Sequence, residues 1–260
     1  MQPAKGTFYQ PLNADSESHQ VEWEQRLDGL AELEISTLYL QWSRHDRSTF
    51  GMQGGWLWRL MRQASDQGFN LVVGLHADSD FFDHVNEHFN AAYWAEYIEK
   101  NIVWGQQMNT LLRQQPELRV AGFFFPGELN DRLLADAATL EQVAVDVGRL
   151  QRRLGRPLYV SVFYTGYLST ADYKLSLQRL RQSDVHVLHQ DGAGTTALNK
   201  NQVDETLLAL NCEFTVIEEL FVQRSDAGFT AISEDLVRAK VAQRSCHPRV
   251  FFSWRYMTPW

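Results

Sequence analysis

Residues 120–128 read VAGFFFPGE, and residues 214–219 read FTVIEE. Each segment is a nearly continuous apolar run, which is typical of a β-strand buried on both faces. Each run ends in a carboxylate, Glu128 in the first and Glu218 or Glu219 in the second. A carboxylate in the core would lose its hydration at a large cost, so these side chains are expected at the rim of a sheet. In a parallel α/β protein, the carboxyl rim of the strands is where ligands bind.

Strand-like and helix-like segments alternate along the whole chain. The expected strands are Gly6–Pro11, Ile35–Trp42, Phe69–His76, Leu118–Phe125, Pro157–Tyr164, Asp184–Gln190, Cys212–Glu219 and Arg249–Tyr256. Amphipathic segments lie between them, at Val21–Leu33, Trp56–Gln67, Tyr93–Arg113, Leu140–Leu154, Tyr173–Arg181, Val203–Leu210 and Glu234–Gln243. Thr139 and Ser233 are the expected N-caps of two of these helices. The alternation predicts an α/β protein with a single (β/α)₈ TIM barrel domain over residues 1–260.

Composition restricts the class of partner. The chain of 260 residues has a net charge of −8 and no prominent Lys/Arg cluster, which argues against a nucleic-acid partner. No apolar stretch is long enough to span a bilayer, so we expect no membrane span.

Amides, carboxylates and aromatic residues gather at the expected strand ends. Amides and carboxylates can bind sugar hydroxyls, and aromatic rings can pack against the C–H faces of a pyranose. The candidate substrate-binding residues are Tyr9, Gln10, Gln41, Trp42, His76, Asp78, Tyr164, Gln190, Asp191, Glu218 and Trp254.

Glu128 is the first candidate catalytic residue. Pro126 and Gly127 are expected to end the strand and turn the chain, which would present Glu128 at the mouth of the barrel. On the other strand, only one of Glu218 and Glu219 can point inward, because neighbouring strand residues face opposite ways. Two carboxylates at one rim are what glycoside hydrolysis needs.

Several of these motifs resemble the family called DUF4434. The resemblance rests on Gly6–Pro11, Leu40–Trp42, Gly122–Glu128 and His189–Gly194, and it covers nearly the whole chain. The family resembles glycosidase-type TIM barrels and often accompanies bacterial polysaccharide genes. The resemblance implies Glu128 as acid/base on the fourth strand and favours Glu219 as nucleophile on the seventh. Gly127 is a departure, since glycosidases of that kind usually carry Asn before the acid/base Glu.

Residues 84–88 read HVNEH and match the H-x-x-E-H pattern of inverted zinc peptidases. On a helix, His84 and His88 would share one face, as zinc binding requires. However, the motif lies in a polar excursion, Ala77–Phe89, and no convincing third ligand follows it. We therefore expect no metal and no cofactor.

Cys212 and Cys246 each precede one of the last two expected strands. In a barrel these strands are neighbours, so both cysteines would lie on the amino-terminal rim at a spacing that suits a disulfide. A disulfide would favour a periplasmic or secreted protein. The start Met1–Gly6 has no signal-peptide pattern, and we expect that a cleaved signal is missing from this sequence.

The residue pattern thus predicts a glycoside hydrolase that acts on a polysaccharide or oligosaccharide, and the family resemblance implies a bacterial exopolysaccharide. The alternative is a non-catalytic carbohydrate-binding or assembly protein that works with exopolysaccharide synthesis and export machinery. That protein would keep the Gln, Tyr and Trp contacts without needing both acids at catalytic distance.

Overall fold

The structure is a computed structural model that describes residues 4–17, 20–85, 88–195, 198–224 and 228–257. Eight parallel strands form a closed barrel in the order β1-β2-β5-β7-β8-β9-β10-β13, and β13 pairs with β1 to close it. The strands are β1 (Lys5–Tyr9), β2 (Thr37–Leu40), β5 (Asn70–Gly74), β7 (Val120–Asn130), β8 (Leu158–Phe163), β9 (His186–Gln190), β10 (Thr215–Glu219) and β13 (Arg249–Phe252). The predicted (β/α)₈ class is confirmed.

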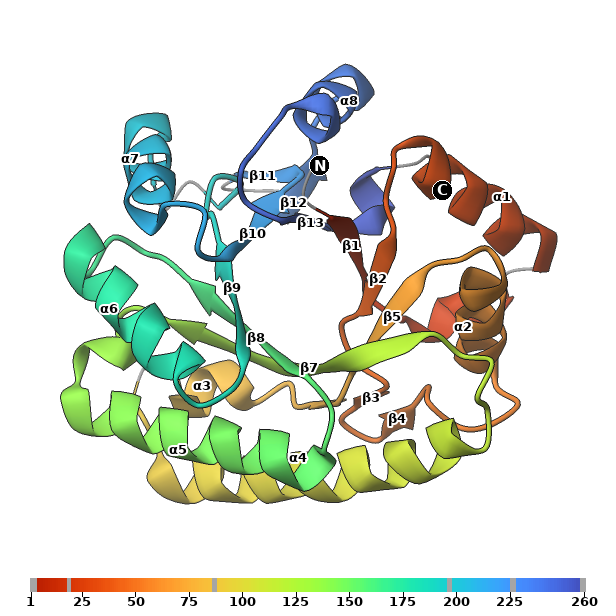
Figure 1. The fold of residues 1–260 in the computed structure, drawn as a ribbon, viewed down its shortest axis with the longest axis horizontal. Coiled ribbons are helices and arrows are strands. Elements are labelled where there is room, and N and C mark those ends of the chain that lie inside the picture. Colours follow the sequence, from red (N-terminus) through yellow and green to blue (C-terminus); the bar gives the residue numbers. More distant parts are fainter. Residues whose placement is uncertain (1–3, 18–19, 86–87, 196–197, 225–227, 258–260) are drawn as a thin grey trace.

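The helices lie outside the ring of strands (Figure 1). They are α1 (Gln20–Glu32), α2 (Trp56–Asp66), α3 (Phe81–Val85), α4 (Ala91–Arg113), α5 (Ala137–Leu154), α6 (Thr170–Arg181), α7 (Lys200–Leu210) and α8 (Glu234–Ala242). Each of the seven predicted helices matches one of these, and α3 is an additional short helix before α4. Within the described residues there are also three 3₁₀ turns, η1 (Asn13–Glu17), η2 (Leu133–Ala135) and η3 (Trp254–Tyr256).

Short strands extend the barrel beyond its carboxyl rim. One small sheet joins β3 (Arg44–His45), β4 (Ser48–Thr49) and β6 (His76–Ala77), and it lies beyond the ends of β2 and β5. The other is a hairpin of β11 (Phe221–Arg224) and β12 (Gly228–Ala231), which follows β10. The predicted excursion Ala77–Phe89 therefore contains part of β6 and all of α3.

The barrel interior is packed with aromatic and branched side chains. One buried cluster fills it, comprising Phe8, Tyr39, Val72, Phe124, Leu188, Ile217 and Val250. The Phe8 ring packs against two of its members, with ring centroids 5.1 Å from Tyr39 and 4.9 Å from Phe124. A larger buried cluster fills the space between the strands and the helices. Because the interior is filled, a ligand can reach the barrel only at an end.

Three local predictions differ from the structure. The last expected strand, Arg249–Tyr256, ends at Phe252, because residues 254–256 form the turn η3. Asp136, not Thr139, caps α5, since its carboxylate accepts a hydrogen bond from the backbone N–H of Thr139 at 2.8 Å. Strand β7 does not end at Phe125 but continues to Asn130, and its pairing with β8 shifts between Phe125 and Leu129. Pro126 and Gly127 thus interrupt the hydrogen-bond ladder without ending the strand. The predicted cap Ser233 of α8 is confirmed.

A disulfide joins Cys212 and Cys246, with 5.4 Å between their Cα atoms. Cys212 precedes β10 and Cys246 precedes β13, and these two strands pair in parallel. The bridge therefore lies at the amino-terminal end of the barrel, as predicted. Among the described residues, no helix is long and apolar enough to cross a bilayer.

Candidate active site

Polar side chains from several strands meet at the carboxyl end of the barrel. Glu128 on β7, Gln190 at the end of β9 and Gln41 just after β2 line a small cavity of about 20 Å³. The remaining lining residues are Phe8, Phe124, Pro126, Ser161, Ile217 and Phe252. A volume of this size holds about one water molecule. The Gln41 Oε1 atom is buried and has no hydrogen-bond partner among the described residues.

The irregularity in β7 places Glu128 at this cavity. The register shift around Pro126–Glu128 inserts extra residues into the strand, and such bulges commonly redirect a side chain next to a functional site. Gly127 is needed there, because a Cβ at this position would lie 2.5 Å from Phe125 Cε1 and 2.9 Å from Phe81 Cε2. Phe81 belongs to α3, so this helix packs over the bulge.

On β10 the alternation of side chains decides between the two adjacent acids. Ile217 belongs to the cluster inside the barrel, so Glu219, two residues further on, shares its inward face. Glu218 faces the other way and forms a paired hydrogen bond with the guanidinium group of Arg249. Glu219 is only 1% exposed.

Both oxygens of Glu219 accept hydrogen bonds. Gln190 Nε2 donates to Oε1 at 2.8 Å, and the backbone N–H groups of Gly194 and Thr195 donate to Oε2 at 2.6 and 3.0 Å. Gly194 must be glycine for this contact, since a Cβ would lie 2.3 Å from the carbonyl oxygen of Phe221. The predicted glycine-rich segment after β9 therefore holds Glu219.

The two inward carboxylates influence each other. The pKa of Glu128 is raised to about 7. Burial is the main cause, the charge of Glu219 adds to the rise, and a hydrogen bond from the Gln190 amide opposes it. Burial also raises the pKa of Glu219, whereas its hydrogen bonds from Gln190, Gly194 and Thr195 lower it. Gln190 therefore lies between the two acids and stabilises the charge of each.

Two predicted substrate contacts lie outside the barrel wall. Asp191 and Glu218 line a separate cavity of about 420 Å³ beside α7 and α8, together with Lys240 and Arg249. Asp191 accepts hydrogen bonds from the backbone N–H groups of Ala193 and Glu219, which fixes the turn after β9. Burial, followed by the charge of Glu219, raises the pKa of Asp191 to about 7. The structure does not bring these two residues to the mouth with Glu128.

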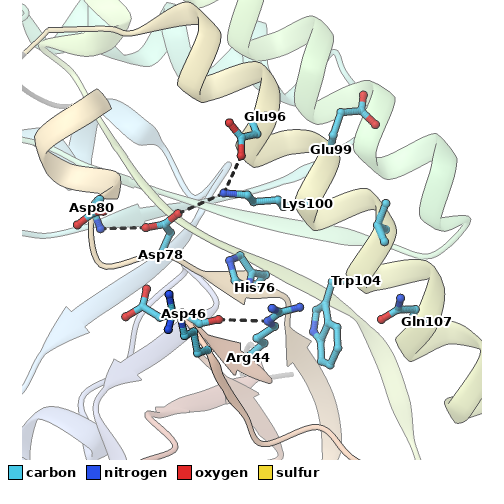
Figure 2. A pocket seen from close by; sticks show the side chains of 12 residues that line it. Arg44, Asp46, His76, Asp78, Asp80, Glu96, Glu99, Lys100, Trp104 and Gln107 are labelled. Carbon is cyan, nitrogen blue, oxygen red and sulfur yellow. Dashed lines mark hydrogen bonds and ion pairs between the residues drawn. The ribbon is translucent and has the colours of Figure 1, made fainter.

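His76 and Asp78 also lie away from the carboxylate pair. They line a cavity of about 710 Å³, which is bounded by α4 and by the small β3–β4–β6 sheet (Figure 2). No residue lines both this cavity and the small one at Glu128.

The predicted aromatic contacts have partners of their own. Tyr9 and Trp254 are fully buried, and the Tyr9 hydroxyl donates to Asp15 at 2.6 Å. Tyr164 is buried, and its hydroxyl donates to the carbonyl oxygen of Leu168 at 2.9 Å. None of the three presents an open ring face. Trp42 is partly exposed and donates to the carbonyl oxygen of Pro11. Gln10, which precedes Pro11, is also partly exposed.

The zinc-peptidase pattern does not form a helical pair of ligands. Helix α3 ends at Val85 and α4 begins at Ala91, so His84 and His88 do not share a helix. Asn86 and Glu87 of the pattern lie outside the described residues. The His84 ring instead stacks on Tyr93, with 4.5 Å between centroids.

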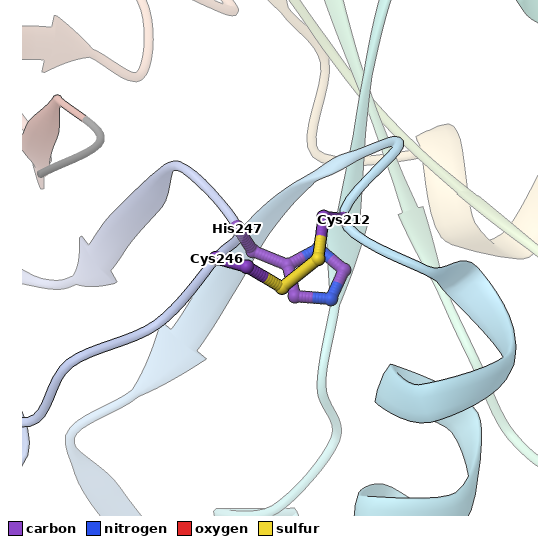
Figure 3. Close-up of side chains that lie close together, drawn as sticks. All are labelled: Cys212, Cys246 and His247. Carbon is purple, nitrogen blue, oxygen red and sulfur yellow. A yellow bond between two sulfur atoms is a disulfide. The ribbon is translucent and has the colours of Figure 1, made fainter. Parts of the chain in front are cut away.

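One His/Cys cluster in the described part of the chain has the compactness of a metal site, namely Cys212, Cys246 and His247 (Figure 3). The two sulfur atoms are bonded to each other, so neither is available as a thiolate ligand. The two ring nitrogens of His247 lie 2.9 and 3.2 Å from the carbonyl oxygens of Phe214 and Leu207. This cluster is therefore a disulfide beside a structural histidine.

Sequence reasoning missed two kinds of residue. Ser161 lines the small cavity, and its polarity within the apolar segment 158–163 was a usable signal. Arg44 and Trp104 line the large cavity, but they lie 60 residues apart in the chain, and no sequence signal links them.

The family model described as a domain of unknown function (DUF4434) matches residues 4–228. This protein belongs to the DUF4434 family. A protein of Escherichia coli (strain K12), described as uncharacterized protein YbcH, is 28% identical over 268 residues, which cover 97% of this chain and 90% of that protein.

Solved barrels of similar fold include two with names from carbohydrate chemistry. A crystal structure of a putative α-L-fucosidase from Bacteroides thetaiotaomicron has a TM-score of 0.70 at 14% identity, covering 97% of this chain and 85% of that one. A β-galactosidase from the psychrophilic Marinomonas ef1 has a TM-score of 0.59 at 9% identity, and the match covers 96% of this chain and 53% of that one. At these identities the likeness shows the fold alone.

Proposed function

We propose that this DUF4434 protein is a glycoside hydrolase with Glu128 as acid/base and Glu219 as nucleophile. The observation that carries the proposal is the pair of inward carboxylates, which share the Gln190 amide at the carboxyl end of the barrel. Glu128 lines the small cavity, and Gln190, which lines it too, donates to Glu219. Glycoside hydrolysis uses two carboxyl groups at one substrate site. The names of the two similar barrels, a putative fucosidase and a galactosidase, support the same reaction class.

The surroundings of the two acids support different roles. The pKa of Glu128 is raised to about 7, so near neutral pH a large fraction of the carboxyl groups carries a proton to donate. Burial raises the pKa of Glu219, and the three hydrogen bonds that it accepts oppose this rise by stabilising the ionised form. As the glycosidic C–O bond breaks, Glu128 protonates the leaving oxygen and Glu219 bonds to the anomeric carbon. Glu128 then takes a proton from the water that displaces Glu219.

A sugar ring is much larger than the cavity of about 20 Å³ at Glu128. The proposal therefore requires the cavity to widen when substrate binds, so that Glu219, which is 1% exposed, can reach the sugar. The unpartnered Oε1 of Gln41 is the acceptor that a sugar hydroxyl would use there.

The small cavity also favours the second candidate, a non-catalytic carbohydrate-binding or assembly protein of an exopolysaccharide secretion system. Such a protein would use Glu219 to hold the segment Gly192–Thr195, as the hydrogen bonds already do. In either case we propose an exopolysaccharide partner and a periplasmic or secreted location. The disulfide supports the location, because such bonds persist in oxidising compartments.

The test compares the wild type with Glu128→Gln and Glu219→Gln on a panel of bacterial exopolysaccharides, with released reducing ends as the readout. An enzyme should lose about 10²- to 10⁴-fold in turnover in Glu128→Gln and still bind the glycan. Glu205→Gln on the exposed face of α7 is the matched control and should keep full activity. Turnover that survives in Glu128→Gln would refute the assignment, whereas binding without any turnover in the wild type would favour the second candidate.

A further inference from the structure

The cavity of about 710 Å³ beside α4 is separate from the carboxylate pair and has the volume of a ligand site. Its walls come from three parts of the chain. Arg44, Asp46 and Arg47 lie on or next to β3, and His76, Asp78 and Asp80 follow β5. Helix α4 supplies the far wall (Figure 2).

A buried polar group faces this cavity without a partner. His76 is 7% exposed, and its Nδ1 atom has no hydrogen-bond partner in the described part of the chain. Burial, together with the charge of Arg44, lowers the pKa of His76, so the imidazole is neutral near pH 7. A neutral imidazole offers one donor and one acceptor nitrogen, and leaving such a group unpaired carries a cost that a bound ligand removes.

Most of the acids around the cavity already have partners. Lys100 pairs with Glu96 at 3.0 Å and lies 4.0 Å from Asp78, and Glu99 pairs with Arg149. Asp46 accepts a hydrogen bond from the backbone N–H of Ser79. Only the carboxylate of Asp80, among the acids that line the cavity, has no ion pair or hydrogen bond within the described residues.

Unlike most of these acids, the two arginines that line the cavity, Arg44 and Arg47, have no ion-pair partner among the described residues. Arg44 Nε donates to the carbonyl oxygen of Asp46 at 3.2 Å, and its guanidinium carbon lies 5.5 Å from the Trp104 ring centroid. Stacking on Trp104 holds the planar group in place, while no carboxylate of the described residues pairs with it. Arg47 is exposed and likewise has no ion pair in the described chain. Arg44 and Arg47 thus have no carboxylate partner among the described residues. Of the five acids that line the cavity, Asp80 is the one whose carboxylate has neither an ion pair nor a hydrogen bond there.

We propose that this cavity binds a carboxylate-bearing sugar unit of a glycan, with Arg44 and Arg47 pairing with the sugar carboxylate. A guanidinium group binds a carboxylate through two parallel hydrogen bonds. Asp80 and His76 are placed to bind the sugar hydroxyls. A dianion such as phosphate fits less well, since five acids line the same cavity. This proposal rests on the proposed function in one respect, namely that the ligand is a glycan. The class of partner is then an acidic glycan.

Isothermal titration calorimetry tests the proposal without any need for turnover. The Glu128→Gln protein is titrated with a glucuronic acid trisaccharide, a neutral glucose trisaccharide and acetate. We expect the uronate to bind at least tenfold more tightly than the other two probes. Arg44→Gln and Arg47→Gln, each made in this background, should weaken uronate binding by about 10- to 100-fold. Arg153→Gln, an exposed arginine on α5, is the matched control and should change nothing.

Arg47 is exposed, so its substitution tests the site even if Arg44→Gln does not fold. The proposal is wrong if the neutral trisaccharide or acetate binds as tightly as the uronate. It is also wrong if no uronate binding is measurable, or if neither arginine substitution weakens that binding. These results are independent of catalysis: lost turnover in Glu128→Gln with unchanged uronate binding supports both proposals, and turnover without arginine-dependent binding refutes this one alone.

Discussion

Glu128 is a carboxyl group in a poor environment for charge. It is partly buried among Phe8, Phe124 and Phe252, and the Gln190 amide that stabilises its charge is shared with Glu219. Glu218, by contrast, has a guanidinium group on the outer side of the wall. Two glutamates thus differ in how well their charge is stabilised, because one faces aromatic rings and the other faces a guanidinium group. The raised pKa of Glu128 makes it the group whose proton can be used near neutral pH.

The same raised pKa predicts how stability varies with pH. Between about pH 4.5 and 7, the native state retains a proton on Glu128 that the unfolded chain has released. The free energy of unfolding should therefore fall as the pH rises through this window, by at most about 1.4 kcal/mol per pH unit for one group. Glu128→Gln should flatten this decline, and urea unfolding at pH 5, 6, 7 and 8 measures it.

Asp191 contributes with the same sign, because its pKa is also raised to about 7, so part of the decline should persist in Glu128→Gln. Glu205→Gln should leave the slope as in the wild type. An unchanged slope in Glu128→Gln would show that Glu128 is not held in its protonated form.

At the scale of elements, the site depends on the irregular parts of two strands. The bulge in β7 presents Glu128, and the turn after β9 directs backbone N–H groups at Glu219. That turn is itself covered by the β11–β12 hairpin, since the N–H of Gln223 donates to the carbonyl oxygen of Gly194 at 2.7 Å. Strand, turn and hairpin therefore form one support for the second carboxylate.

Gly194→Ala tests this support. The added Cβ would lie 2.3 Å from the backbone carbonyl oxygen of Phe221 and 3.0 Å from Glu219 Oε2. Backbone must shift to admit it, so we expect a loss of about 1–3 kcal/mol in the free energy of unfolding. The hydrogen bonds to Glu219 should weaken as well, and any glycan turnover should fall. Chemical denaturation and the reducing-end assay measure the two effects.

Gly155→Ala is the comparison, since Gly155 caps α5 with a φ of 64° and open space around its Cα. It should cost about 1 kcal/mol through backbone conformation alone and leave turnover unchanged. Equal effects of the two substitutions on turnover would contradict the role given to Gly194.

For the whole molecule, the disulfide acts at the end of the barrel opposite the candidate site. The two cysteines are 34 residues apart in the sequence, and the loop that they close contains β10, the β11–β12 hairpin and α8. In the chain-entropy model, a loop of this length adds about 4 kcal/mol to the free energy of unfolding. The bridge therefore stabilises the segment that supplies Glu219 without contacting it.

The double variant Cys212→Ser/Cys246→Ser should lose up to about 4 kcal/mol, measured by urea unfolding. A reductant should destabilise the wild type by a similar amount and leave the double variant unaffected. Glycan binding by the folded variant should match that of the wild type. Equal stability of oxidised and reduced wild type would show that the bridge contributes little.

Much of the architecture was readable from sequence because it follows from local periodicity. The eight strands and seven of the helices come from apolar patterns that a single segment carries by itself. The pairing of Cys212 with Cys246 followed once the last two strands were taken as neighbours. Family membership, too, rested on contiguous motifs such as those ending at Glu128 and Gly194.

Only the tertiary structure decided which polar residues share a space. Glu219 and Glu218 are adjacent in sequence, yet the pleat of β10 sends one into the barrel and the other to Arg249. His76 follows a barrel strand like Gln41, but it lines a different cavity beside α4. Side-chain burial and long-range pairing depend on how distant segments pack, and a local pattern contains no information on that.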